Sequence, residues 1–257
     1  MKKEIETTLV VVRDDPLGVM EEIAALRSLG PYRLSPPVML SLKDTYYDTP
    51  SRLLSTRGIA VRTRESGTSV LFCIKQDERI DESGAAFRDE FEMPWSRQCF
   101  DHIAHILHKL ARCVGEVPAR TDSPGECLVC LGLTAIQERE TARLAKNAEA
   151  TDGPDRGVLA EVALDRVCYH LSGFRILHYE IEVEATSPDL IDPVRDLTAL
   201  LRQRYGGCLM PWRHNKLVTG LALEQLIAEG RLSVHPGRFT CLAGTDYMAI
   251  ETVLKDF

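Results

Sequence analysis

Apolar and polar residues alternate along the opening segment KKEIETTLVV, residues 2–11. Side chains of a strand point alternately to its two faces, so Glu4 and Glu6 share one face while Ile5 and Leu9 share the other. The apolar face predicts packing against a core. The acidic face has two explanations: the strand is a solvated edge, or this face points at a cation.

Seven further segments have the residue content of strands and are separated by Gly-, Pro- and Asp-rich turns. They span residues 39–50, 58–65, 69–76, 85–94, 133–144, 158–171 and 175–186. Their spacing is typical of hairpins, and such a series of strands favours closure into an antiparallel barrel. The predicted fold is therefore α+β, a closed eight-stranded antiparallel barrel with helices packed outside.

Helical patterns occur between and after the predicted strands. The segment 14–30 has a proline in its first turn and a closing glycine, as capped helices do. Apolar spacing predicts further helices near 97–114, 189–205 and 214–229. From about residue 231 onward there is no clear pattern, and the sequence assigns this tail no role.

Composition narrows the class of protein. The chain has 257 residues, 44% apolar and 27% charged, which are ordinary values for a globular protein. The formal net charge of -7 argues against a general nucleic-acid binder. No apolar run approaches the roughly 20 residues that span a bilayer, and no signal-peptide core follows Met1. We therefore expect no membrane partner and a cytoplasmic location, while the oligomeric state is not predicted.

Cysteines and histidines offer a weaker alternative site. The eight cysteines have no framework spacing, and only Cys127 and Cys130 form a CxxC pair. A structural zinc site needs a second pair or suitably spaced histidines, so this pair does not favour zinc. His102, His105 and His108 fall on the flank of a predicted amphipathic helix.

Charged residues gather on single faces of several strands. Glu180, Glu182 and Glu184 share a face, and Arg62 and Arg64 share another. Further charged residues lie on single strand faces in the same way, namely Lys75, Arg88, Arg139, Glu161 and Asp165. Any one such strand fits an ordinary solvated sheet. Six strands with this pattern favour a charged barrel interior.

A charged interior is stable only if it is wet or if a charged ligand and a metal compensate the desolvation. Basic side chains facing clustered carboxylates suit one kind of ligand in particular, a polyphosphate with a divalent metal. The basic side chains would bind phosphate oxygens and the carboxylates would bind the metal.

The motifs that carry these charges resemble those of the CYTH proteins, or triphosphate tunnel metalloenzymes. This family includes inorganic triphosphatases, thiamine triphosphatases and class IV adenylate cyclases. The resemblance rests on the opening ExE, YYDTP (46–50), GIAVRTRE (58–65), LFCIKQ (71–76), RDEFEMP (88–94), ERET (138–141), AEVALD (160–165), HYEIEVE (178–184) and NKLVTGLAL (215–223). It covers residues 1–225, which we assign to a tunnel domain, and leaves 226–257 as a C-terminal extension.

The resemblance implies a tunnel that binds a triphosphate lengthwise, with Mg²⁺ or Mn²⁺ on carboxylates. The implied metal residues are Glu4, Glu6, Asp165, Glu180 and Glu182. The implied triphosphate-binding residues are Arg62, Arg64, Lys75, Arg88, Arg139 and Lys216. Glu4, Glu6, Lys75 and Asp165 would also take part in catalysis. The expected activity is metal-dependent hydrolysis of a small triphosphate, such as tripolyphosphate or a nucleoside or thiamine triphosphate.

One residue departs from the family signature ExExK, because Thr8 stands where the lysine is expected. A charge-assisted bond to an anion contributes on the order of 1.5–3 kcal/mol, so its loss weakens binding or catalysis. Three alternatives stay open: a class IV-type adenylate cyclase, a triphosphate-binding module with weakened catalysis, and a β-rich protein with solvated charged faces.

Overall fold

Eight long strands form the body of the protein in the computed structural model, which describes residues 1–111, 123–151 and 157–255. The end of the helix predicted near 97–114 lies outside these residues. The strands are β1 (Lys2–Val11), β4 (Val38–Asp48), β5 (Ala60–Ser66), β6 (Ser69–Ile80), β7 (Ala86–Pro94), β8 (Thr134–Ala150), β9 (Val158–Leu171) and β10 (Phe174–Ala185).

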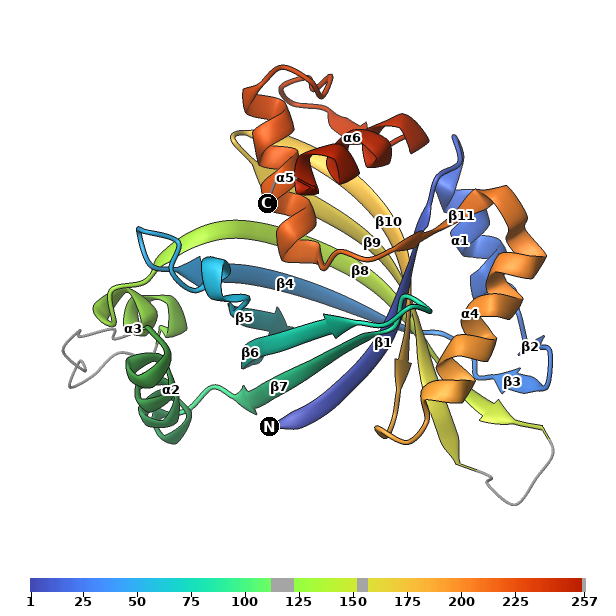
Figure 1. The fold of residues 1–257 in the computed structure, drawn as a ribbon, viewed down its shortest axis with the longest axis horizontal. Helices are drawn as coiled ribbons and strands as arrows, with labels where there is room; N and C mark the ends of the chain where they lie inside the picture. Colours follow the sequence, from blue (N-terminus) through green and yellow to red (C-terminus); the bar gives the residue numbers. More distant parts are fainter. Residues whose placement is uncertain (112–122, 152–156, 256–257) are drawn as a thin grey trace.

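The sheet closes on itself, as predicted from the sequence. The strands follow the order β1-β7-β6-β5-β4-β8-β9-β10, and β10 pairs again with β1. Every one of these pairings is antiparallel. The strongly curved sheet is visible in Figure 1. Because a closed barrel gives each strand one interior face, the register decides which side chains meet inside.

Two helices cover one outer side of the barrel. They are α1 (Pro16–Ala25) and α4 (Ile191–Tyr205). The outer residues Ile5, Leu9, Ile181 and Val183 belong to the same apolar core as these helices, which confirms the predicted outward face. The first helix is shorter than the predicted 14–30, because the chain turns after it into the short strands β2 (Ser28–Leu29) and β3 (Tyr32–Leu34).

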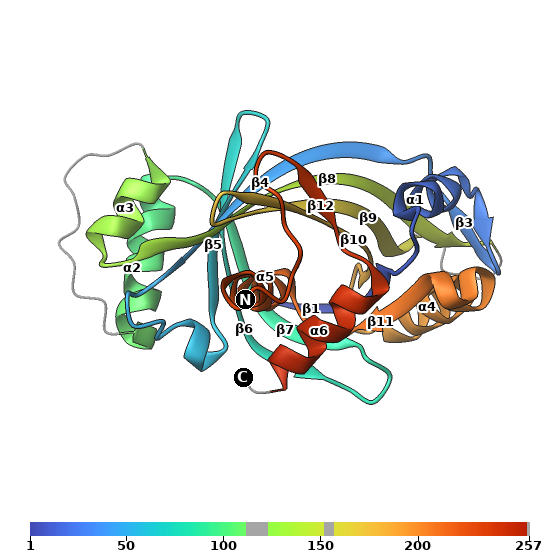
Figure 2. The same cartoon turned by 90° about the horizontal axis from the view of Figure 1, so that it is seen from above.

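A second pair of helices lies at the other end of the molecule, α2 (Arg97–Ala111) and α3 (Pro124–Cys130). Figure 2 shows the two pairs on opposite sides of the barrel. Phe100, Ile103 and Leu107 of α2 are buried with Cys127 of α3 in a separate core. The three predicted flank histidines of α2 are exposed, as an amphipathic helix requires.

The C-terminal part of the chain packs onto the barrel. It contains β11 (Leu209–Trp212), α5 (Lys216–Ala228), β12 (Phe239–Cys241) and α6 (Gly244–Leu254), and β12 pairs in parallel with β10. Tyr247 and Ile250 of α6 share a core with Trp212 and with Val10 of β1. The tail that lacked a sequence pattern is thus folded. The boundary at residue 225 stays a prediction.

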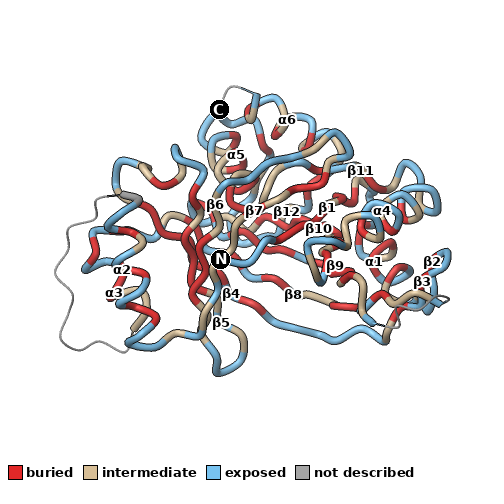
Figure 3. Tube along the Cα trace, turned by 60° about the horizontal axis from the view of Figure 1, so that its bottom comes forward, coloured by how far each residue is buried: buried red, intermediate tan, exposed pale blue. Residues whose placement is uncertain are grey.

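Burial follows the barrel wall. In Figure 3 the buried segments run along the strands, while the exposed segments lie mainly in turns and on outer helix surfaces. Two single 3₁₀ turns, Ser55–Arg57 and Gly206–Cys208, complete the fold. None of the helices within the described residues combines the length and the apolar character that crossing a membrane requires.

Candidate active site inside the barrel

A cavity of about 270 Å³ lies inside the barrel. Its charged lining consists of Lys2, Arg62, Arg64, Lys75, Arg88, Arg139, Arg143 and Lys216 and of Glu4, Glu6, Glu78, Glu90, Glu92, Glu180, Glu182 and Glu184. Basic and acidic residues are thus equal in number. Net charge alone does not draw a polyanion into such a space, so an anionic ligand is favoured when a cation accompanies it.

The basic residues of β5 and β8 gather around one carboxylate. Asp44 of β4 accepts from Arg64 Nε at 2.7 Å and from Arg139 Nη2 at 2.9 Å, and Arg62 Nη1 lies 3.6 Å away. Burial opposes ionisation of Asp44, but Arg62, Arg139 and Arg64 together hold its pKa well below the usual range. Tyr46 contacts Arg139 and Arg62 through its hydroxyl. The cluster therefore keeps surplus positive charge beside the cavity.

A second group joins β1 to β6 and β7. Lys75 Nζ lies 2.6 Å from Glu4 Oε1, and Arg88 Nη1 lies 2.6 Å from Glu6 Oε1. Arg88 also donates to Glu78. Burial raises the pKa of Glu6, but the charge of Arg88 lowers it, and the net result is a pKa of about 2. Glu6 is therefore ionised, and both opening glutamates are paired with cationic side chains.

A third group joins β8, β9, β10 and α5. Arg143 donates two bonds of 2.7 Å to Asp165 and a further bond to Glu182. Lys216 Nζ lies 3.1 Å from Asp165 Oδ2 and also contacts Glu180 and Glu182. Burial raises the pKa of Glu182 and lowers that of Lys216, because it disfavours both charges. A further cation would relieve this carboxylate cluster.

Behind Glu180, the interior face of β10 continues to His178, which is fully buried. Its Nε2 lies 2.7 Å from Glu180 Oε2, and its Nδ1 lies 3.0 Å from the hydroxyl of Tyr247. Burial, with the nearby charge of Lys216, lowers the pKa of His178 to about 3. The imidazole is therefore neutral at physiological pH.

Two carboxylate groups have the geometry of metal sites. One consists of Glu4, Glu6 and Glu184, the other of Asp165, Glu180 and Glu182, and in each group one oxygen per residue lies within 4.8 Å of the others. Oxygen-only donor sets suit Mg²⁺ and Mn²⁺. The residues present therefore fit a hard divalent cation.

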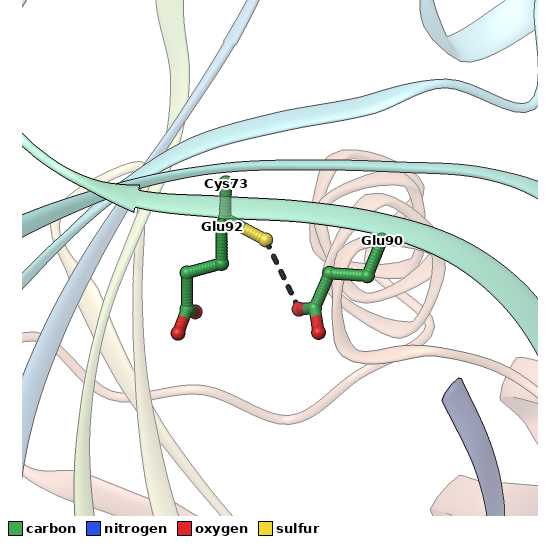
Figure 4. Close-up of side chains that lie close together, drawn as sticks. All are labelled: Cys73, Glu90 and Glu92. Atoms are coloured by element: carbon green, nitrogen blue, oxygen red, sulfur yellow. Dashed lines mark hydrogen bonds between the residues drawn. The ribbon is translucent and has the colours of Figure 1, made fainter. Parts of the chain in front are cut away.

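A third group differs in its chemistry. Cys73 of β6 lies beside Glu90 and Glu92 of β7, and its thiol donates to Glu90 Oε1 at 3.3 Å, as Figure 4 shows. Burial raises the pKa of Cys73 to about 11, so the thiol keeps its proton. A protonated thiol is a poor metal ligand. This group is therefore a weaker metal site than the two carboxylate groups.

The structure brings the predicted site residues together. Glu4, Glu6, Arg62, Arg64, Lys75, Arg88, Arg139, Glu180, Glu182 and Lys216 all line the cavity. Asp165 is fully buried and reaches the site through Arg143 and Lys216. Thr8, the departure from the signature, also lines the cavity and lies opposite Glu182 in the β1–β10 register.

The sequence interpretation missed Arg143, Asp44 and His178. Arg143 could have been found, because it shares a strand face with Arg139 four residues earlier. Asp44 is a single carboxylate in an otherwise ordinary strand, and its role depends on pairing with two neighbouring strands. His178 depends on a contact with α6, for which no sequence signal was available.

Comparison with known proteins agrees with this architecture. The family model described as "CYTH domain" matches residues 21–207, and the chain belongs to this family. The family is metal-dependent, its members bind triphosphate substrates, and they are typically triphosphatases. No curated protein matched the sequence.

Among solved structures, a protein from Hippeastrum shares the fold. It is described as an adenylyl cyclase candidate with a dominant triphosphatase activity, and it aligns with a TM-score of 0.52, 17% identity and coverage of 90% of this chain and 97% of that one. An adenylate cyclase candidate from Bacillus halodurans aligns with a TM-score of 0.45 and 20% identity, over 84% of this chain and 97% of that one.

Proposed function

We propose that this protein is a metal-dependent triphosphatase that hydrolyses the terminal phosphoryl group of a short linear polyphosphate. One observation carries the proposal: an arginine cluster and two oxygen-donor groups lie around the same barrel cavity on different strands. Basic residues on β5 and β8 face carboxylates on β1 and β10. This separation suits a phosphate chain with its metal.

The basic residues would bind and orient the phosphate chain. Arg62, Arg64 and Arg139 are held beside the cavity by Asp44, so little reorganisation is needed when phosphate oxygens arrive. Their planar guanidinium groups suit phosphate oxygens, which accept paired hydrogen bonds. Lys75, Arg88 and Lys216 would exchange part of their carboxylate contacts for contacts with phosphate.

The carboxylates would hold the metal. Glu4, Glu6, Asp165, Glu180 and Glu182 are the proposed ligands of Mg²⁺ or Mn²⁺. A bound divalent cation neutralises charge on the phosphoryl oxygens and on the leaving group. A carboxylate of the Glu4–Glu6 pair would orient the attacking water, and Lys75 beside it would stabilise developing negative charge.

Thr8 supports a second candidate, a binding module with weakened turnover. The residue lines the cavity but carries no charge where the signature has lysine. Lys216 contacts Glu182, the residue opposite Thr8, so a cation is still present in this part of the site. We therefore favour the enzyme over the binder.

A phosphate-release assay tests the proposal. Tripolyphosphate, ATP and thiamine triphosphate are each incubated with the protein in Mg²⁺, in Mn²⁺ and in EDTA. We expect metal-dependent phosphate release from tripolyphosphate, and loss of that release in Glu6→Gln. Glu140→Gln, on the exposed outer face of β8, is the matched control.

Each of three other outcomes would contradict the proposal. Binding of tripolyphosphate without turnover favours the binding module. Formation of cyclic AMP from ATP favours the cyclase. Absence of both binding and turnover with all three compounds contradicts a triphosphate function altogether.

A further inference from the structure

The C-terminal helix α6 reaches the proposed metal residues through a chain of two hydrogen bonds. Tyr247 of α6 lies 3.0 Å from His178 Nδ1, and His178 Nε2 lies 2.7 Å from Glu180 Oε2. Tyr247 and His178 are completely buried, and Glu180 is 1% exposed. Solvent therefore cannot replace any member of this chain.

The acceptor of this chain is Glu180. A carboxylate accepts hydrogen bonds, so Nε2 of His178 donates to Glu180. The Tyr247 hydroxyl bonds the other ring nitrogen, Nδ1. The two bonds together hold the imidazole ring in the orientation that directs Nε2 at Glu180.

The two carboxylate oxygens of Glu180 have different partners. His178 holds Oε2, while Oε1 contacts Lys216, which in turn contacts Asp165 and Glu182. Glu180 belongs with Asp165 and Glu182 to one of the two oxygen-donor groups. Oε1 is therefore the oxygen of Glu180 that His178 leaves available to a metal ion. Hydrogen bonds to a ligating carboxylate fix its orientation and strengthen metal binding.

The Tyr247 ring is itself held in place. It meets the Trp212 ring edge-on with centroids 5.3 Å apart, and it lies 5.6 Å from the His178 ring. Trp212 is anchored by a 3.0 Å bond from its Nε1 to Thr219 of α5. The hydroxyl is therefore presented by a rigid apolar contact between α6 and the barrel.

We propose that Tyr247 and His178 are positioning residues that hold Glu180 in its metal-binding orientation, so that the C-terminal helix is part of the site. This inference rests on the proposed function, because it assumes that the Asp165–Glu180–Glu182 group binds a divalent cation. It gives the segment after residue 225 a role that the sequence did not reveal.

Direct titration of Mn²⁺ into the purified full-length protein, followed by calorimetry, tests the inference without relying on turnover. Tyr247→Phe removes one hydroxyl and keeps the ring. We expect it to weaken Mn²⁺ binding about threefold to tenfold, a part of the roughly 10–100-fold that outer-shell changes cost. Tyr32→Phe is the matched control, because Tyr32 is also buried but its hydroxyl bonds Asp196, outside the cavity lining.

A second pair of variants separates positioning from packing. His178→Leu should weaken Mn²⁺ binding more than Tyr247→Phe does, by roughly 10–100-fold, because it removes the donor to Glu180. His178→Gln, which can still offer an N–H to Glu180, should recover part of that loss. In the triphosphatase assay, the metal concentration needed for half activity should rise in the same order.

The outcomes distinguish the inference from the proposed function. If the unsubstituted protein binds Mn²⁺ and Tyr247→Phe binds it equally well, the inference is wrong and the proposed function stands. If Tyr32→Phe weakens binding as much as Tyr247→Phe, the effect is general destabilisation and the inference is wrong. If the unsubstituted protein binds no Mn²⁺, the proposed function fails and the inference fails with it.

Discussion

Lys75 Nζ lies 2.6 Å from Glu4 Oε1 and 2.8 Å from Glu4 Oε2, so a proposed phosphate-binding cation is paired with a proposed metal ligand. Burial opposes the charge on Lys75, but Glu4 and Glu6 raise its pKa above the usual value. The two charged residues satisfy each other across the β1–β7–β6 part of the barrel. A metal–triphosphate complex offers both of them a replacement partner.

Glu4→Gln should therefore abolish metal-dependent turnover and also lower stability. The substitution leaves Lys75 with Glu90, at 3.5 Å, as its remaining carboxylate partner. Breaking a buried ion pair by removing one partner costs about 3–5 kcal/mol, and partial exposure of Lys75 reduces this to about 1–3 kcal/mol. Urea denaturation in EDTA measures the loss. Unchanged stability would mean that the Lys75–Glu4 pair contributes nothing, and Glu140→Gln serves as the control.

Asp44→Asn tests whether the arginine cluster depends on its central carboxylate. We expect a loss of about 3–5 kcal/mol in the free energy of unfolding at pH 7, because three arginines lose their shared counter-charge. Tripolyphosphate should restore part of the stability by supplying negative charge to the same arginines. An Asp44→Asn protein as stable as the parent, with or without tripolyphosphate, would exclude this role.

The difference in free energy of unfolding between the parent and Asp44→Asn should depend on pH in a defined direction. The folded-state pKa of Asp44 lies below its unfolded value of about 3.8, so its contribution is fully present above that value. The contribution is lost as the pH falls through the lower folded pKa. The stability difference between the parent and Asp44→Asn should therefore be constant from pH 7 to 5 and shrink below about pH 4. A difference that already declines between pH 7 and 5 would contradict this assignment.

The contribution of Glu184 to stability should depend on pH in the opposite direction to that of Asp44. Burial raises its pKa, with help from Glu4 and Glu6, to about 7. The folded state then binds a proton more tightly than the unfolded state, so stability falls as pH rises from about 4.5 to about 7. Glu184→Gln should be more stable than the parent at pH 8 by about 1–2 kcal/mol and nearly equal at pH 4.5.

Thermal unfolding in EDTA at pH 4.5 and pH 8 measures this difference. Mn²⁺ should reduce the advantage of Glu184→Gln at pH 8, because the metal relieves repulsion among the same carboxylates in the parent. A Glu184→Gln protein less stable than the parent at pH 8 would show that this glutamate is stabilising rather than crowded.

Thr8→Lys should strengthen triphosphate binding. Thr8 lines the cavity, and a lysine there would reach the ligand from a strand position that the register already directs inward. We expect about tenfold tighter binding of tripolyphosphate with Mg²⁺, which corresponds to about 1.4 kcal/mol. Ser69→Lys adds the same charge at an exposed strand end and is the control. Weaker binding would mean that the cavity is adapted to the smaller side chain.

The fold could be predicted because strand alternation is a local property. The face that holds Glu4 and Glu6 and the face that holds Ile5 and Leu9 follow from the two-residue period alone, and the structure places them inside and outside as expected. Closure followed from the number of strands and their hairpin spacing. The family resemblance then supplied the identity of the ligand, which alternation cannot provide.

The contacts that the sequence did not reveal are long-range. Asp44 meets Arg139 across 95 residues of chain, and His178 meets Tyr247 across 69. Such pairs depend on register and on helix docking, which a single sequence does not specify. Helix α6 was missed because its few buried residues, including Tyr247 and Ile250, give only a short apolar pattern.

A diffraction experiment tests the central claim most directly. Crystals grown with Mn²⁺ and tripolyphosphate would be measured at the manganese absorption edge to locate the metal by its anomalous signal. We predict a manganese peak within the Glu4–Glu6–Glu184 group or the Asp165–Glu180–Glu182 group, with phosphate density against Arg62, Arg64 and Arg139. Manganese and phosphate bound only outside the barrel cavity would contradict the assignment of this cavity as a metal-dependent triphosphate site.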